Sequence, residues 1–264
     1  MNSAWSVALG ALAVTFAQQP PPIQNARVET RPAAGLDAAM RQLVAAPPSD
    51  PAWVGYSVPA APSQPQTCWS DQYASTVHLE GPKEFYILYR IHENRIERIR
   101  TFSPDCVIDG GNAAFVWLTQ VKPAESVAFL GSIMQDTARR HPDGTLGAIA
   151  IHAAPEATAF LLQTARTAQS AHQRGQALFW LARTAPPQVS EPAIQEAIDK
   201  DPAVEVQRQT AAALYQIPHN EGIPLLLRLA SDHRKPTVQK QAMFWLGRSK
   251  DPRAAKFFEE VLGR

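Results

Sequence analysis

The residue types that most often bind metals or act as nucleophiles are sparse in this sequence. In the first half the candidates are Cys68, His78, His92 and Cys106, and no two of them have the close spacing of a zinc site. None of the later histidines forms a pair at the spacing of helical metal ligands; they are His141, His152, His172, His219 and His233. The chain also lacks a G-x-S-x-G element, a phosphate-binding loop and a dinucleotide fingerprint. We therefore predict no catalytic residues, no metal and no cofactor, although a metal site assembled in space stays open.

Cys68 and Cys106 are the only two cysteines of the chain. In an exported protein an even cysteine count most simply indicates a disulfide, so we predict a bond between them. Two buried free thiols are the alternative. A catalytic thiol is disfavoured, because neither cysteine has a neighbouring histidine or basic cluster in the sequence.

Two aromatic pairs are candidates for contact with another protein, since tryptophan is a frequent anchor at interfaces. They are Phe179-Trp180 and Phe244-Trp245, and Tyr215 lies between them in the chain and joins the candidate set.

The residues between the two pairs suggest a seat for an apolar side chain of a partner. If Trp180 and Trp245 face outward, they flank a gap over Ala212 and Ala213, which take the place of the aromatic pair in the intervening segment. The alternative is that both tryptophan rings wedge between helices as core, because large aromatic residues in a broadly apolar helix are mostly buried.

The aromatic pairs belong to an internal repeat. QALFWLAR at 176–183 returns as QAMFWLGR at 241–248, and QTAAALYQ at 209–216 fits the same frame, in steps of 33 and 32 residues. A fixed period in this range indicates stacked supersecondary units. We predict an α-solenoid of about four helical pairs over residues 123–264. The predicted pairs are 145–152 with 155–167, 173–184 with 191–200, 204–217 with 221–231, and 237–248 with 251–262.

The alternation of a leucine-rich helix, a proline-containing turn and an alanine-rich second helix resembles HEAT repeats, particularly the short bacterial, armadillo-like kind. Residues 241–248 and 251–262 carry the resemblance best, and it covers about residues 123–264. It implies a curved right-handed superhelix that binds partners along the surface of its second helices. The front half resembles no family that we can name.

The front half reads as a small mixed α/β domain at 35–122. A short amphipathic helix at 35–46 precedes a strand at 52–60. An antiparallel hairpin follows, with strands at 84–91 and 95–103 and a turn at Glu93-Asn94. Residues 76–80 are a further strand candidate, and 114–121 form either a last strand or the lead-in to the helices.

The N-terminus reads as an export signal followed by a loose segment. Residues 1–17 hold an apolar run that is too short to span a bilayer but suits a signal peptide, despite the absence of a basic residue before it. An uncleaved apolar arm is the alternative. Residues 18–34 are proline-rich, and we predict that they are flexible. The expected location is the periplasm or the extracellular space, with no stable membrane span after cleavage.

The composition bounds the possible functions. The formal net charge of the 264-residue chain is +1, which argues against nucleic acid as a partner. We therefore predict a non-catalytic scaffold or assembly factor of the bacterial cell envelope that binds another protein or peptide. The main rival is an enzyme, either one similar to the HEAT-like lyases that attach bilin pigments or a hydrolase in the front domain. The predicted signal peptide argues against the lyase, and the lack of an identifiable nucleophile and base argues against the hydrolase.

Overall fold

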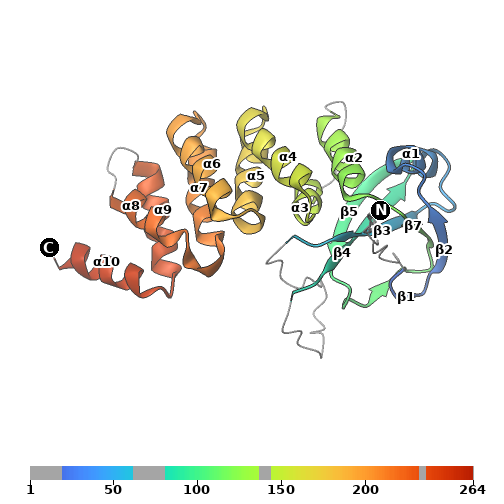
Figure 1. Cartoon of the computed structure of the whole chain (residues 1–264), viewed down its shortest axis with the longest axis horizontal. Helices are drawn as coiled ribbons and strands as arrows, with labels where there is room; N and C mark the ends of the chain where they lie inside the picture. The colour runs from blue at the N-terminus through green and yellow to red at the C-terminus, as the bar shows by residue number, and fades with distance from the viewer. Residues whose placement is uncertain (1–19, 62–80, 137–143, 232–235, 264) are drawn as a thin grey trace, which may run out of the picture.

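The computed structural model describes residues 20–61, 81–136, 144–231 and 236–263. It places a mixed β-sheet at one end of the molecule and a row of helices that leads away from the sheet to the C-terminus (Figure 1). The strands are β1 (Ile23–Gln24), β2 (Arg27–Pro32), β3 (Ala52–Pro59), β4 (Glu84–His92), β5 (Arg95–Phe102), β6 (Ile108–Asp109) and β7 (Ala114–Thr119). The helices are α1 (Leu36–Ala45), α2 (Pro123–Gln135), α3 (Thr145–Ala150), α4 (Pro155–Thr167), α5 (Ala171–Thr184), α6 (Pro187–Lys200), α7 (Val204–Gln216), α8 (Ile223–Ser231), α9 (Pro236–Arg248) and α10 (Pro252–Leu262).

The main sheet has the strand order β2-β7-β3-β4-β5. β2 and β3 run parallel to β7, whereas β4 is antiparallel to both β3 and β5. Successive side chains of a strand point to opposite faces. On β4, Phe85, Ile87 and Tyr89 join the main core, whereas Tyr86 and Leu88 join a second cluster on the other face. The buried residues of α1 and α2 belong to the main core, so these helices cover the first face.

The predicted antiparallel hairpin is confirmed. β4 and β5 pair around Glu93 and Asn94, and both residues have positive φ angles, of 50° and 54°. Two-residue turns of this kind match the right-handed twist of the strands that they connect. The predicted strand at 52–60 and the helix at 35–46 are also present, and residues 114–119 form a strand, not a lead-in to the helices. The strand candidate at 76–80 lies outside the described residues.

The prediction that residues 18–34 are flexible is wrong for the two stretches of this segment that form strands, residues 23–24 and 27–32. Residues 27–32 form β2, an edge strand in register with all six residues of β7, and residues 23–24 pair with β6. The backbone hydrogen bonds to β7 hold this strand, and its exposed Arg27 and Glu29 are typical of the charged residues that protect a sheet edge. Because an edge strand needs little apolar surface, its polar composition resembled that of a loose terminus.

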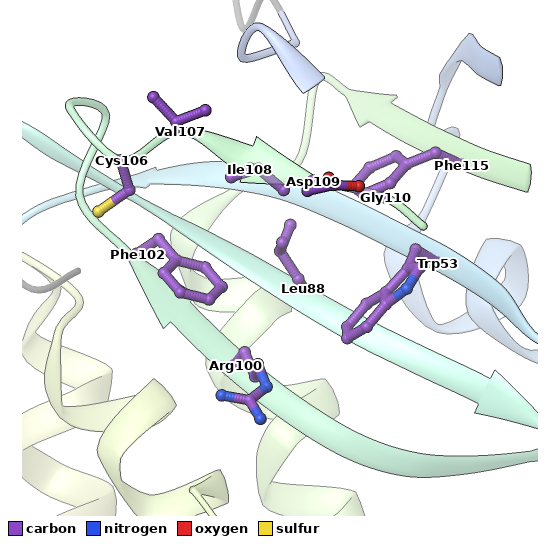
Figure 2. Close-up of a pocket in the computed structure, with 10 residues that line it drawn as sticks. All are labelled: Trp53, Leu88, Arg100, Phe102, Cys106, Val107, Ile108, Asp109, Gly110 and Phe115. Atoms are coloured by element: carbon purple, nitrogen blue, oxygen red, sulfur yellow. The ribbon is translucent and has the colours of Figure 1, made fainter. Parts of the chain in front are cut away.

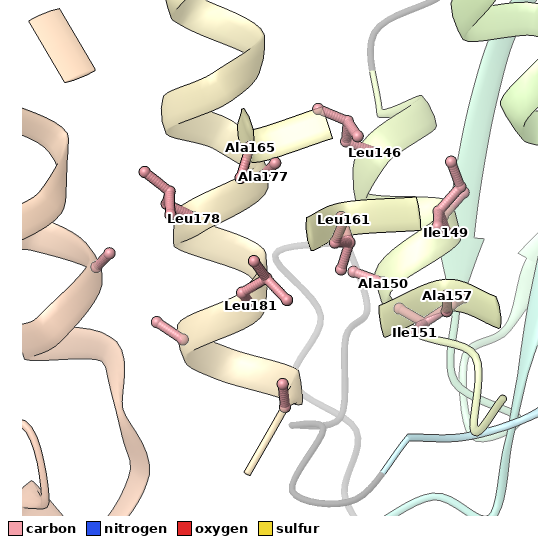
Figure 3. Close-up of a cluster of buried hydrophobic side chains, with 14 of the residues drawn as sticks. Leu146, Ile149, Ala150, Ile151, Ala157, Leu161, Ala165, Ala177, Leu178 and Leu181 are labelled. Carbon is pink, nitrogen blue, oxygen red and sulfur yellow. The ribbon is translucent and has the colours of Figure 1, made fainter. Parts of the chain in front are cut away.

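The helices behind the sheet pack as pairs, but the pairs begin one helix earlier than predicted. α4 packs most extensively against α5, and α8 against α9, so the last helix α10 follows the pairs as a single helix. Figure 3 shows buried side chains of both helices, among them Leu161 and Ala165 of α4 and Ala177 and Leu181 of α5, which belong to one hydrophobic cluster. A sequence period fixes the spacing of the units and not the point at which a unit begins, which explains the shift.

The sheet and the helices share one hydrophobic core. A single cluster of buried side chains extends from Leu36 of α1 and Val54 of β3 to Ala254 of α10. The backbone is also joined at the boundary, where Ala61 N donates to Ile151 O at 2.7 Å and Ala153 N donates to Pro59 O at 2.9 Å. The helical part is therefore anchored directly to the end of β3.

Candidate partner-binding surface

Three helices that carry the sequence repeat lie side by side, since α7 packs against α5 on one side and α9 on the other. Two positions of the repeat frame, one helical turn apart, are at least partly exposed on all three helices. We call the residues at these positions the aromatic–arginine face: Phe179, Ala212 and Phe244 at the first position, and Arg183, Gln216 and Arg248 at the second.

Each phenylalanine of this face lies below the arginine that follows it by one turn. The guanidinium carbon of Arg183 is 5.7 Å from the centre of the Phe179 ring, and that of Arg248 is 5.9 Å from the centre of the Phe244 ring. Residues four apart are neighbours on a helix surface, and a guanidinium at this distance makes a cation–π contact with the ring. Phe244 remains 54% exposed, so it is still accessible to a partner beside the arginine.

The tryptophans of the two pairs point toward the neighbouring helix on their N-terminal side. The Trp180 ring packs so closely on α3 that a Cβ added to Gly147 would lie 2.8 Å from Trp180 Cζ2. The Trp245 ring stacks on Tyr215 of α7, with 4.9 Å between the ring centres and an angle of 28°. Both tryptophans are partly buried and pack against the main core.

The partly exposed small residue of α7, Ala212, shares its frame position with the phenylalanines and not with the tryptophans. Ala213 is fully buried, so it forms no part of the surface. Ala212 is partly exposed, and the residues in its frame position on the two adjacent helices are Phe179 and Phe244. The helical spacing from each phenylalanine to the arginine four residues later was the available signal for this orientation, since it places both residues on the polar side of the helix.

The arginines of the face retain donors for a partner. Arg183 Nη1 donates to Gln216 Oε1 at 2.8 Å, and Arg183 Nε is buried without a hydrogen-bond partner in the described part of the chain. The side chain of Arg248 forms no ion pair with any described residue, and Lys240, one turn before Phe244 on α9, adds an exposed cation.

A partly buried ion pair links α5 to the start of α7. Arg174 Nε and Nη2 donate to the two Asp201 carboxylate oxygens at 2.6 and 3.0 Å, and Asp201 Oδ1 also accepts from Ala203 N at the start of α7. The side chains of Arg174 and Asp201 are only 13% and 8% exposed. The Arg174 guanidinium is the main cause of the lowered pKa of Asp201. This two-pronged contact fixes the helix that carries Phe179 relative to the helix that carries Ala212.

The structure also brings together a serine and a histidine that the sequence did not connect. Ser126 Oγ of α2 lies 2.8 Å from His152 Nε2, which follows α3, and 2.7 Å from Tyr56 Oη of β3. Tyr89 Oη of β4 is 2.6 Å from Tyr56 Oη. His152 Nδ1 lies 3.0 Å from the carbonyl oxygen of Ile149 and so donates to it, which leaves Nε2 as an acceptor for the Ser126 hydroxyl.

This serine–histidine network is buried, and its geometry suits a structural role. Ser126 and Tyr56 are fully buried, and His152 is 3% exposed. Burial lowers the pKa of His152 to about 4, so the imidazole is neutral at pH 7. A nucleophile needs contact with substrate, and none of these atoms reaches the surface. The network joins the sheet, α2 and the end of α3, which are the elements that anchor the array.

The other predicted site residues are placed as follows. Cys106 is buried, and its Sγ lies 3.5 Å from Ser103 Oγ. Cys68 and residues 1–17 lie outside the described residues, so the disulfide and the signal peptide stay predictions.

Within the described ranges, no group of three or more histidine, cysteine, aspartate or glutamate side chains could hold a metal ion. None of the helices in these ranges combines the length and the apolar character needed to cross a bilayer.

Comparison with known proteins bears on the C-terminal helices. Residues 190–264 match the family model of HEAT repeats. This match confirms the predicted resemblance for the segment that runs from within α6 through α10. No curated protein and no solved structure matches the chain.

Proposed function

Since residues 190–264 match the family model of HEAT repeats, we propose that this protein is a non-catalytic scaffold or assembly factor of the bacterial cell envelope. It binds another protein or peptide on the aromatic–arginine face. HEAT repeats commonly serve as protein-interaction scaffolds, because stacked repeats present a long, preformed surface that orders little on binding. In this proposal the solenoid begins at α2 and continues to α10 as a curved, right-handed superhelix, and the sheet closes its N-terminal end.

The observation that carries the proposal is the repetition of one surface arrangement on α5 and α9. The same ring–guanidinium contact is made by Phe179 with Arg183 on α5 and by Phe244 with Arg248 on α9. Between these two helices lies α7, which carries the small residue Ala212 at the equivalent position. Core packing alone does not require an aromatic ring beside a cation, both at least partly exposed, at both places.

The chemistry of the face indicates the kind of partner. An apolar side chain fits over Ala212 between the two phenylalanine rings, and a carboxylate or carbonyl oxygen pairs with a guanidinium. The partner is therefore a segment with apolar and acidic side chains close together. The envelope location rests on the apolar run at residues 1–17, and fractionation of cells that express the full chain tests it.

The experiment compares capture of a partner from envelope extract by the mature chain and by two variants. One variant combines Phe179→Ser with Phe244→Ser, and the other combines Arg183→Gln with Arg248→Gln. We expect both to lose the partner while their thermal unfolding stays cooperative. The matched control combines Val261→Ser with Leu262→Ser, which removes apolar side chains of 43% and 82% exposure outside the face. Capture that survives both face variants, or that the control abolishes equally, would exclude this surface.

A further inference from the structure

The sheet has a cavity on the face that α1 and α2 leave uncovered. The cavity has a volume of about 240 Å³. Residues of strands β3, β4, β5 and β7 form its floor, and the segment 106–110 lies on the opposite side of the cavity (Figure 2). It lies in the front part of the chain, away from α5, α7 and α9, and the inference drawn from it does not depend on the proposed function.

Cross-strand neighbours build the part of the sheet beneath the cavity, and two of them, Leu88 and Arg100, line it. Trp117, Gly55, Leu88 and Arg100 follow one another across β7, β3, β4 and β5 in register. A Cβ at Gly55 would lie 2.5 Å from Leu88 Cδ2, so the glycine lets the large side chains of this face close together. Four large apolar side chains of the sheet line the cavity: Trp53, Leu88, Phe102 and Phe115.

Two charged side chains, Arg100 and Asp109, line the cavity, and among the described residues only Asp109 has hydrogen-bond partners. The Asp109 carboxylate accepts hydrogen bonds from Gly111 N and from Asn25 Nδ2, both at 2.8 Å. These donors, the Gly111 amide first, lower the pKa of Asp109 and hold it ionised. Arg100 forms no ion pair or hydrogen bond with any described residue, although it is only partly exposed and lies beside Leu88 (Figure 2). Within the described ranges, the cavity thus has largely apolar walls, one hydrogen-bonded carboxylate at Asp109 and one guanidinium, that of Arg100, without a partner.

We propose that this cavity binds a small aromatic carboxylate, with the ring among Trp53, Leu88 and Phe102 and the carboxylate on Arg100. Ligand sites are mostly apolar, with a few polar groups that fix orientation, and this lining has that character. The volume is below the roughly 300–1,000 Å³ of sites for drug-sized ligands, so the ligand has about one ring. A guanidinium pairs with a carboxylate through two parallel hydrogen bonds.

The test uses two fluorinated probes and the full mature chain. 4-(Trifluoromethyl)phenylacetate carries the carboxylate, and 4-(trifluoromethyl)phenylacetamide is its neutral counterpart. Titration followed by fluorine NMR of each probe gives its dissociation constant. We expect the acid to bind saturably and at least about tenfold more tightly than the amide, as for a hydrogen-bonded ion pair.

Two arginine variants distinguish binding in the cavity from nonspecific attraction of the ligand to the positive charge of the sheet. Arg100→Gln is expected to weaken binding of the acid about tenfold and to leave the amide unchanged. Arg98→Gln is the matched control, because Arg98 is exposed two residues earlier on the same strand and is not part of the lining. Both residues are on the surface side of an edge strand, so both variants should fold. Absence of saturable binding, or equal effects of the two substitutions, would overturn the proposal.

Discussion

At the scale of single residues, the outward and inward aromatic side chains have different roles. Phe179 and Phe244 lie under arginines at the surface, whereas Trp180 and Trp245 pack toward the preceding helices. Adjacent residues of a helix point about 100° apart, so one member of each Phe-Trp pair can face a partner while the other fills the seam between helices. In each pair the phenylalanine is therefore available to a partner, while the adjacent tryptophan packs against the neighbouring helix and holds the phenylalanine in place.

His152 gives a prediction about pH. Its pKa falls from 6.5 in the unfolded chain to about 4 in the folded protein, because burial penalises the charged imidazole. The unfolded chain therefore binds more protons between these values, and the folded state loses stability as the pH falls from about 6.5 to 4. The loss from this residue amounts to about 3 kcal/mol.

Urea denaturation at several pH values checks this prediction. The comparison is with His152→Gln, which keeps an acceptor for Ser126 but does not titrate. We expect the free energy of unfolding of the variant to vary less between pH 4 and 6.5 than that of the natural chain. Parallel curves for the two proteins would show that another group controls the acid sensitivity.

At the scale of elements, close approach between successive helices determines where the tryptophans lie. α3 approaches α5 at Gly147, where the Trp180 ring occupies the space that a side chain would need. At Gly247 of α9, by contrast, the nearest side-chain atom to an added Cβ is Phe258 Cζ, at 3.9 Å. One glycine is therefore required by packing and the other is not.

These two glycines predict opposite effects of the same substitution. Gly147→Ala forces the Trp180 ring to move, and we expect it to lower the free energy of unfolding by about 1–3 kcal/mol. Gly247→Ala fits without a close contact and improves helix propensity, so it should raise stability by up to about 1 kcal/mol. Chemical denaturation of both variants measures the difference. If Gly147→Ala also stabilises the protein, Trp180 does not lie where the structure places it.

At the scale of the whole molecule, the sheet and the helices depend on each other. The main core passes without interruption from the sheet into the array, and Ser126 and His152 bond to the tyrosines of β3 and β4. The boundary predicted at residue 122 therefore separates two kinds of architecture but cuts through a shared core.

Two fragments test this dependence. A fragment of residues 20–122 lacks α2 and α3, so the core face of its sheet would be exposed to water. We expect this fragment to unfold without cooperativity and to bind hydrophobic dyes. A fragment of residues 20–168 retains α2, α3, α4 and the network around His152, and it should unfold in a cooperative transition by circular dichroism. Cooperative unfolding of the shorter fragment would show that the front part is independent.

The sequence by itself determined the features that local periodicity controls. The 33- and 32-residue steps predicted the stacked helices, and the alternation around Glu93-Asn94 predicted the hairpin. Both signals come from residues close together in the chain, because helix and hairpin patterns repeat within a few residues. The aromatic pairs were identified for the same reason, as a repeat within equivalent helices.

The tertiary structure alone decided which helix begins each pair, which aromatic ring faces outward, and that polar residues 27–32 complete the sheet. It also brought Ser126 to His152 and Arg100 to an apolar cavity. Each of these features depends on residues that are distant in sequence and meet only when strands and helices pack. No local sequence pattern predicts these contacts, because the packing of the shared core and the register of distant strands determine them.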